Sequence, residues 1–210
     1  MCGRYYIETE SDLIEIRKIF AVLSDRYFGQ PAGEALHGGE IFPTQAAPVI
    51  RPMATAEGVK LLPDLMQWGF SGKTLLINAR AETAASKPTF REALQGGRIL
   101  VPATSFFEWQ KVEPPARDTT KLRLYCPTAP VFSMAGLYRP IPAGENPNHL
   151  TGQFVILTGP ANDSVAPIHD RMPLVLPRHL LRPWLQQDAL AFELLTRAIS
   201  ADFTAGPALR

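Results

Sequence analysis

Short apolar runs interrupted by prolines set the strongest limit on what this chain can fold into. The chain contains twenty prolines, which break its candidate helices and favour strand edges and turns. Runs typical of strands outnumber helical stripes, and the two do not alternate as in a parallel βαβ fold. The sequence therefore predicts an α+β fold with a mostly antiparallel, barrel-like β-sheet flanked by helices.

The predicted elements spread over nearly the whole chain. Strands are expected at residues 3–7, 47–50, 66–70, 75–77, 98–109, 121–126, 131–138 and 154–157. Helical stripes are expected near residues 13–20, 89–95 and 188–199. A chain of 210 residues suits one large domain, so we assign residues 1–210 to a single domain. We expect a loose tail from about residue 200.

Charge and cysteine usage narrow the class of protein. The net charge of +1 carries no bulk signature of a nucleic-acid binder, so a polyanion site must be a local patch. The two cysteines, Cys2 and Cys126, form neither a disulfide framework nor a zinc motif. No signal peptide and no membrane-spanning apolar run is found. We expect a cytoplasmic monomer without metal or cofactor, whose thiols stay reduced.

Cys2 stands directly after the initiator methionine. If Met1 is removed, Cys2 carries an α-amino group and a thiol on adjacent carbons. Their reference pKa values, ~8 and ~8.5, leave some of each as a nucleophile at neutral pH. An aldehyde can condense with the amine to a Schiff base, and the thiol can then close a five-membered thiazolidine ring. This chemistry needs an accessible Cys2; the alternative is a small buried cysteine without a chemical role.

Glu108 is an unusual carboxylate because Phe106, Phe107 and Trp109 surround it in the sequence. Poor solvation raises the pKa of a carboxyl group toward the range in which it serves as a general acid or base. The alternative is that Glu108 points outward from an amphipathic strand while its aromatic neighbours point inward.

Asn78 and His169 lie where apolar strands give way to polar residues. Asn78 can orient a substrate or the Cys2 end of the chain through hydrogen bonds, or simply end a strand in a turn. His169 can move protons or stabilise a developing charge near neutral pH, or serve as a structural histidine bonded by Asp170.

Three arginines and several aromatic residues could contact a polyanion. Arg4, Arg80 and Arg171 can bind phosphates, or be held in salt bridges with acidic neighbours such as Glu82 and Asp170. The candidate DNA-binding set also includes Pro43, Trp68 and Thr158. An aromatic ring such as Trp68 can stack on a base, but buried aromatics more often belong to the core.

Six segments occur in a fixed order: MCGRY, INARAET, VPATSFFEWQ, MAGLY, LTGPAN and IHDRMP. Over roughly residues 1–185 they resemble the SRAP family (SOS-response-associated peptidase). The resemblance implies a single α+β fold that senses abasic sites in single-stranded DNA. It implies that Cys2, after removal of Met1, forms a thiazolidine crosslink with the ring-opened abasic sugar.

The resemblance also implies roles for the other site residues. Asn78 is expected to position the Cys2 end and the sugar, and Glu108 to shuttle protons. His169 is expected to stabilise the Schiff base. Arg4, Arg80 and Arg171 are implied to contact phosphates.

Two other classes of function stay open at this point. The first is a thiol peptidase with Cys2 as nucleophile and His169 as base, whose readily implied substrate is its own Met1 bond. The second is a noncovalent single-strand binder that uses the three arginines and the aromatic residues, with salt-sensitive binding and no covalent product.

Overall fold

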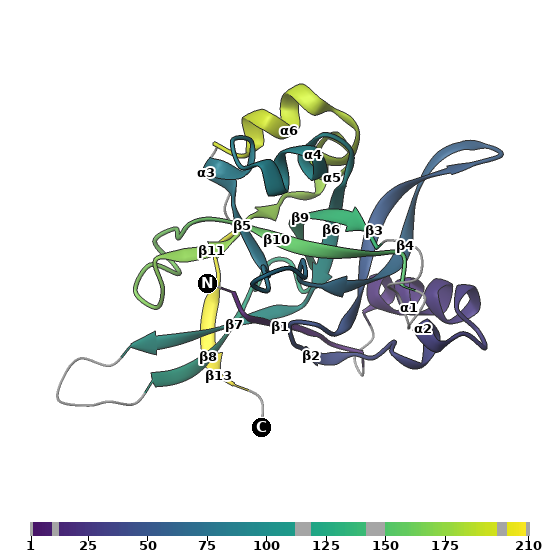
Figure 1. Ribbon diagram of the computed structural model, residues 1–210. Helices are drawn as coiled ribbons and strands as arrows, with labels where there is room; N and C mark the ends of the chain where they lie inside the picture. Colours follow the sequence, from purple (N-terminus) through teal and green to yellow (C-terminus); the bar gives the residue numbers. More distant parts are fainter. Residues whose placement is uncertain (1, 10–12, 112–118, 142–149, 197–200, 209–210) are drawn as a thin grey trace.

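The computed structural model describes residues 2–9, 13–111, 119–141, 150–196 and 201–208. Its strands form two sheets that share the interior of the molecule (Figure 1). The strands are β1 (Arg4–Ile7), β2 (Gly39–Ile41), β3 (Ala46–Thr55), β4 (Gly58–Trp68), β5 (Asn78–Arg80), β6 (Arg98–Ala103), β7 (Ser105–Lys111), β8 (Thr119–Tyr125), β9 (Phe132–Pro140), β10 (Gly152–Pro160), β11 (Arg171–Pro173), β12 (Val175–Leu176) and β13 (Thr204–Pro207).

The larger sheet closes on itself. Its order is β11-β10-β4-β3-β6-β9-β12, and β9 also pairs with β10, so β10, β4, β3, β6 and β9 form a ring. Most pairs are antiparallel, whereas β10 pairs in parallel with β4 and β5. The five-stranded sheet has the order β13-β8-β7-β1-β2. This architecture confirms the predicted α+β fold with a mostly antiparallel, barrel-like sheet.

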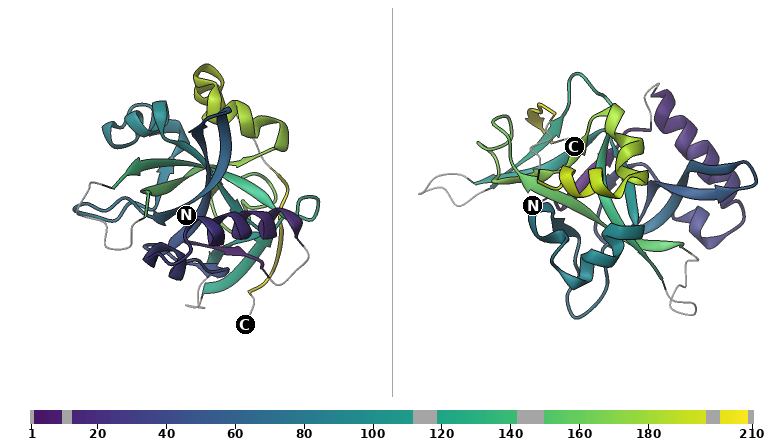
Figure 2. Two further views of the ribbon diagram at one scale, coloured as in Figure 1. Left: turned by 90° about the vertical axis from the view of Figure 1, so that its right-hand side faces the viewer. Right: turned by 90° about the horizontal axis from the view of Figure 1, so that it is seen from above.

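Helices cover two separate sides of the ring (Figure 2). Helix α1 buries Ile16, Ile19 and Leu23, the spacing of one helical face. With α2 it lies on one side, and α3 to α6 lie on another. The helices are α1 (Ile14–Arg26), α2 (Pro31–Glu34), α3 (Ala81–Ala84), α4 (Pro88–Gly96), α5 (Leu181–Gln186) and α6 (Asp188–Leu194), with a 3₁₀ turn at Arg178–Leu180. Residues 197–199 of the last predicted helix lie outside the described residues.

A continuous core joins the five-stranded sheet to the ring. Strand β1 alternates, with Tyr5 and Ile7 fully buried and Arg4 and Tyr6 partly exposed. Tyr5 packs edge-on against Trp68, with ring centroids 5.2 Å apart. Cys2 belongs to the same buried cluster. The beginning of the chain therefore lies between the two sheets, next to the ends of ring strands.

The prediction of a loose tail is wrong for the described part of the C-terminus. Thr204–Pro207 forms strand β13, which pairs antiparallel with β8. Phe203, which precedes it, is buried and packs edge-on against Phe106 and Phe132 at 5.0 and 5.3 Å. Burial of this ring fixes the segment to the sheet. The assignment of residues 1–210 to one domain stays a prediction.

Candidate active site

Asn78 and the start of the chain are joined by a hydrogen bond. The Asn78 Nδ2 atom donates to the backbone oxygen of Cys2 at 2.8 Å. Asn78 begins β5, whose parallel pairing with β10 sets Asn78 opposite Ile156. The Asn78 Oδ1 atom is buried and has no hydrogen-bond partner among the described residues. The amide therefore fixes residue 2 on one side and keeps an acceptor for a further group on the other.

The Cys2 thiol is fully buried, which differs from the accessible cysteine that the chemistry requires. Its Sγ atom lies 3.5 Å from the backbone oxygen of Arg4. Burial raises the pKa of the Cys2 thiol well above its usual range, and the nearby charge of Glu108 acts in the same direction. The physical reason for the difference is packing, because Cys2 belongs to the hydrophobic cluster between the two sheets. Met1 itself lies outside the described residues.

Glu108 points into the protein from strand β7, so the outward-facing alternative is wrong. Its exposed fraction is 2%, and its neighbours Phe106 and Phe107 are buried as well. Burial raises the pKa of Glu108 to about 7, and the negative charge of Asp170 contributes in the same direction. A carboxyl group that titrates near neutral pH can both give and accept a proton under physiological conditions. Glu108 therefore has the properties of a general acid and base beside residue 2.

His169 faces Glu108 from the turn that precedes β11. The His169 Nε2 atom lies 4.0 Å from Glu108 Oε2. The backbone N–H of Arg171 donates to His169 Nδ1 at 2.9 Å, so the neutral ring carries its proton on Nε2, toward Glu108. Asp170 Oδ1 lies 3.0 Å from the same Nδ1 atom, so it pairs with the ring only in the protonated, charged form of His169. The structure thus brings His169, Glu108, Asn78 and Cys2 together from four separate segments.

Arg171 is engaged by protein acceptors. Its guanidinium forms a bidentate ion pair with Glu82 and donates to the Thr158 backbone oxygen at 2.6 Å. The hydrogen bonds from Arg171 lower the pKa of Glu82. Thr158 is fully buried. The expected phosphate contacts of Arg171 and Thr158 stay predictions, and they require a change in this arrangement.

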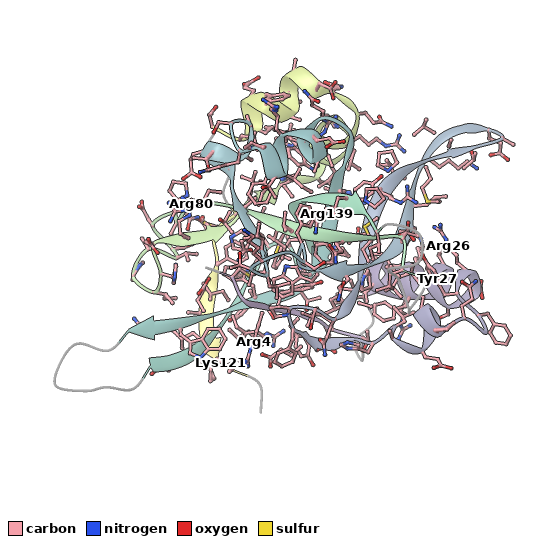
Figure 3. The ribbon with its side chains drawn as sticks, viewed as in Figure 1. Arg4, Arg26, Tyr27, Arg80, Lys121 and Arg139 are labelled. Atoms are coloured by element: carbon pink, nitrogen blue, oxygen red, sulfur yellow. The ribbon has the colours of Figure 1, made fainter. Side chains whose placement is uncertain are left out.

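Arg80 and Arg4 differ in their surroundings (Figure 3). The Arg80 side chain is exposed at the end of β5. Arg4 donates to Glu40 Oε1 at 3.2 Å, and Glu40 also accepts from Lys121 at 2.7 Å. Glu40 and Lys121 were not expected at the site, because neither lies in a recognisable motif. The alternation of Lys121 with Arg123 along β8 was the one available signal for a basic strand face.

Trp68 and Pro43 are the remaining members of the predicted DNA-binding set, and Trp68 is not placed to stack on a base. Trp68 is fully buried, and its indole N–H donates to the Ile77 oxygen at 2.9 Å. In this structure it presents no face for stacking on a base, and it instead supports the segment that leads to Asn78. Pro43 is partly exposed in the turn between β2 and β3, and its predicted DNA contact stays a prediction.

A cavity of about 400 Å³ lies elsewhere, lined in part by Arg123, Tyr125 and Cys126. None of the four predicted catalytic residues is among its described lining residues.

Within the described ranges, no group of three or more His, Cys, Asp or Glu side chains could hold a metal ion. No helix in the described part of the chain is long and apolar enough to span a membrane.

Comparison with known families assigns this chain to one family. The model of the SOS response associated peptidase (SRAP) family matches residues 1–207. The chain therefore belongs to the SRAP family, as its motifs predict.

Curated relatives support the assignment. The abasic site processing protein YoqW of Bacillus subtilis is 33% identical over 190 residues, which cover 88% of this chain and 80% of that protein. The abasic site processing protein YedK of Escherichia coli is 33% identical over 129 residues, which cover 60% of this chain and 55% of that protein.

Solved structures share the fold at low sequence identity. A protein from Bordetella bronchiseptica superposes with a TM-score of 0.70 at 18% identity, covering all of both chains. A protein from Bacteroides thetaiotaomicron gives a TM-score of 0.69 at 22% identity, covering 97% of this chain and 90% of that chain. At these identities the likeness shows the fold alone.

Proposed function

We propose that this protein captures abasic sites in single-stranded DNA through a covalent bond to Cys2, after removal of Met1. The observation that carries the proposal is the hydrogen bond from Asn78 to the Cys2 oxygen at 2.8 Å. It ties the future N-terminus to a site that also holds Glu108 and His169. The names of the relatives YoqW and YedK, both abasic site processing proteins, support the choice of substrate.

The proposed reaction joins an aldehyde and an aminothiol. The ring-opened abasic sugar carries an aldehyde at C1′, and the Cys2 amine attacks this carbon. Loss of one water gives the imine. The thiol then adds to the imine carbon, a carbon–sulfur bond forms, and the thiol proton moves to nitrogen. The product is a thiazolidine, and no oxidant, metal or cofactor enters the balance.

Glu108 supplies the proton transfers in this scheme. In its protonated form it gives a proton to the hydroxyl that leaves as water, and as a carboxylate it can take a proton from the attacking amine. Its pKa of about 7 leaves both forms populated near neutral pH. His169, whose Nε2 faces Glu108 at 4.0 Å, stabilises the charge that develops on this carboxyl group. Asn78 holds residue 2 in place.

DNA binding in this proposal rests on the arginines around the site. Arg80 is exposed and free to reach a phosphate, whereas Arg171 must first exchange Glu82 for the phosphate. Arg4 stands two residues after Cys2, so it contacts a phosphate close to the captured sugar. Single-stranded DNA is proposed because the aldehyde must reach a buried residue between two sheets.

The test uses a uracil-containing oligonucleotide treated with uracil glycosylase. Incubation with the Met1-processed protein should give a band that survives denaturing electrophoresis. The Cys2→Ala variant should lose the band, and Cys126→Ala, which changes the other buried cysteine, should keep it. We expect Glu108→Gln to slow capture by about 10²-fold. Equal crosslinking by Cys2→Ala would rule out the proposed chemistry.

The thiol peptidase and the noncovalent binder stay predictions. Sustained turnover of peptide substrates by the processed protein would favour the peptidase. Salt-sensitive DNA binding without a covalent band would favour the noncovalent binder.

A further inference from the structure

One carboxylate beside the site is shared by two cations. Glu40, on strand β2, accepts a hydrogen bond from Arg4 Nη1 at 3.2 Å. Both of its oxygens also accept from Lys121 Nζ, at 2.7 and 2.8 Å. The three side chains come from three strands of the five-stranded sheet: β1, β2 and β8. Two cations that converge on one pair of oxygens form the geometry of an anion-binding site.

Aromatic rings hold both cations in place. The Arg4 guanidinium lies 4.6 Å from the Phe42 ring centroid and 5.2 Å from that of Trp109. The Lys121 ammonium lies 4.2 Å from the Phe107 centroid and 6.0 Å from that of Trp109. Cation–π contacts of this kind restrict where each charge can move. The two positive charges are therefore fixed on the same side of the sheet, around Trp109.

The cation pair lies on the opposite face of the five-stranded sheet from Glu108, and the strand that carries Arg4 begins two residues after Cys2. Arg4 follows Cys2 by two residues, and on the neighbouring strand it pairs with Phe107, which precedes Glu108. Arg4 and Phe107 point to one face of the sheet, and Glu108 points to the other. When the abasic sugar of a DNA strand reaches Cys2, a phosphate of a neighbouring nucleotide would come close to Arg4 and Lys121. Figure 3 shows Arg4 and Lys121 close together on the five-stranded sheet.

Glu40 can be replaced because the ion pairs are partly open to water. The side chains of Arg4, Glu40 and Lys121 are 37%, 23% and 24% exposed. Water can reach these ion pairs, and an arriving phosphodiester replaces the carboxylate as their anion, so the exchange does not leave the cations unpaired. A phosphodiester presents two oxygens to the cations, as a carboxylate does.

We infer that Arg4 and Lys121 form a phosphate-binding subsite for the DNA strand, which the Glu40 carboxylate occupies until a phosphodiester takes its place. The inference deepens the proposed function and rests on it. It assigns Lys121 as a DNA contact and Glu40 as an internal competitor. Removal of the Lys121 charge should therefore weaken DNA binding, and removal of the Glu40 charge should strengthen it.

The experiment measures binding of a fluorescent single-stranded oligonucleotide without an abasic site, by anisotropy, over about 50 to 200 mM NaCl. Lys121→Gln should weaken binding several-fold and reduce the slope of log K against log salt by about 0.7. Glu40→Gln should tighten binding several-fold. Lys121→Arg should restore affinity, because it keeps the cation. Inorganic phosphate at equal ionic strength should compete weakly, since it lacks the rest of the strand.

The matched control is the ion pair between Lys60 and Glu57 on the β3–β4 hairpin. Lys60→Gln and Glu57→Gln change the net charge by the same amounts at a remote place and should leave affinity nearly unchanged. Equal effects of Lys60→Gln and Lys121→Gln, no tightening by Glu40→Gln, or no binding by the wild-type protein would overturn the inference. Thermal unfolding of each variant identifies a loss of folding.

The Cys2-dependent crosslink separates this inference from the proposed function. If the crosslink forms but the variants bind DNA like their controls, the subsite is wrong and the function stands. If the variants behave as expected but no crosslink forms, the proposed chemistry is wrong.

Discussion

Glu108 lies in an environment unlike that of an ordinary, solvated glutamate. It is nearly inaccessible to water, and burial raises its pKa from 4.5 to about 7. Between these two pH values the folded state binds more protons than the unfolded state. The free energy of unfolding therefore falls as pH rises from about 4.5 to about 7. The buried position that suits Glu108 to proton transfer thus lowers the stability of the protein above neutral pH, where the carboxyl group is ionised.

Glu108→Gln should remove this pH dependence, because glutamine does not ionise. At pH 8 we expect the variant to gain up to about 3 kcal/mol in the free energy of unfolding relative to wild type, and close to nothing at pH 4.5. Urea unfolding at both pH values measures the difference. Glu57→Gln, at an exposed position, should show no such change between the two pH values. A constant difference for Glu108→Gln would contradict the raised pKa.

Two buried tyrosines offer opposite outcomes for the same substitution. The Tyr5 hydroxyl is buried without a hydrogen-bond partner among the described residues, whereas the Tyr27 hydroxyl donates to buried Asp64. We expect Tyr5→Phe to stabilise the protein by about 1 kcal/mol and Tyr27→Phe to destabilise it by about 1–3 kcal/mol. Thermal unfolding measures both. A loss of stability in Tyr5→Phe equal to that in Tyr27→Phe would contradict this account.

At the scale of single residues, the sequence predicts which residues share the site but not which charged side chains pair with each other. The motifs around Asn78, Glu108 and His169 left structural alternatives open one by one, and only the family resemblance of the ordered segments predicted that these residues share a site with Cys2. The partnership of Glu40 with Lys121 could not be predicted, because 81 residues separate the two along the chain. The burial of Cys2 depends on packing between two sheets, which no local pattern reports.

At the scale of elements, strand patterns predicted most of the sheet. Strand β6 is buried along its whole length, which its continuous apolar run indicates. Strand β13 was missed because Thr204–Pro207 has little strand propensity of its own. The segment is ordered by the pairing with β8 and by Phe203, and both contacts join parts of the chain that are far apart in sequence.

Phe203 should therefore carry much of the stability of the C-terminal segment. Phe203→Ala removes a ring that packs on Phe106 and Phe132, and we expect a loss of about 3–5 kcal/mol in the free energy of unfolding. The matched control is Phe28→Ala, at a phenylalanine that is 88% exposed, which should change stability little. Equal losses in the two variants, measured by denaturant unfolding, would show that β13 is not anchored by this ring.

At the scale of the whole molecule, the fold places the beginning of the chain between its two sheets. Asn78 of β5 and Glu108 of β7 lie beside residue 2, and His169, in the turn before β11, faces Glu108. The same enclosure that raises the pKa of Glu108 also buries the Cys2 thiol. The proposal therefore requires that removal of Met1 both free the amine and open the thiol to the DNA.

Intact mass spectrometry of the protein after incubation with an abasic-site oligonucleotide tests the central claim most directly. The account predicts an adduct whose mass is that of the Met1-processed protein plus the oligonucleotide less one water, with the attachment mapped to Cys2 by peptide fragmentation. The same chain with an uncleaved extension before Cys2 should give no adduct. An adduct at another residue, or an equal yield from the extended chain, would contradict the account.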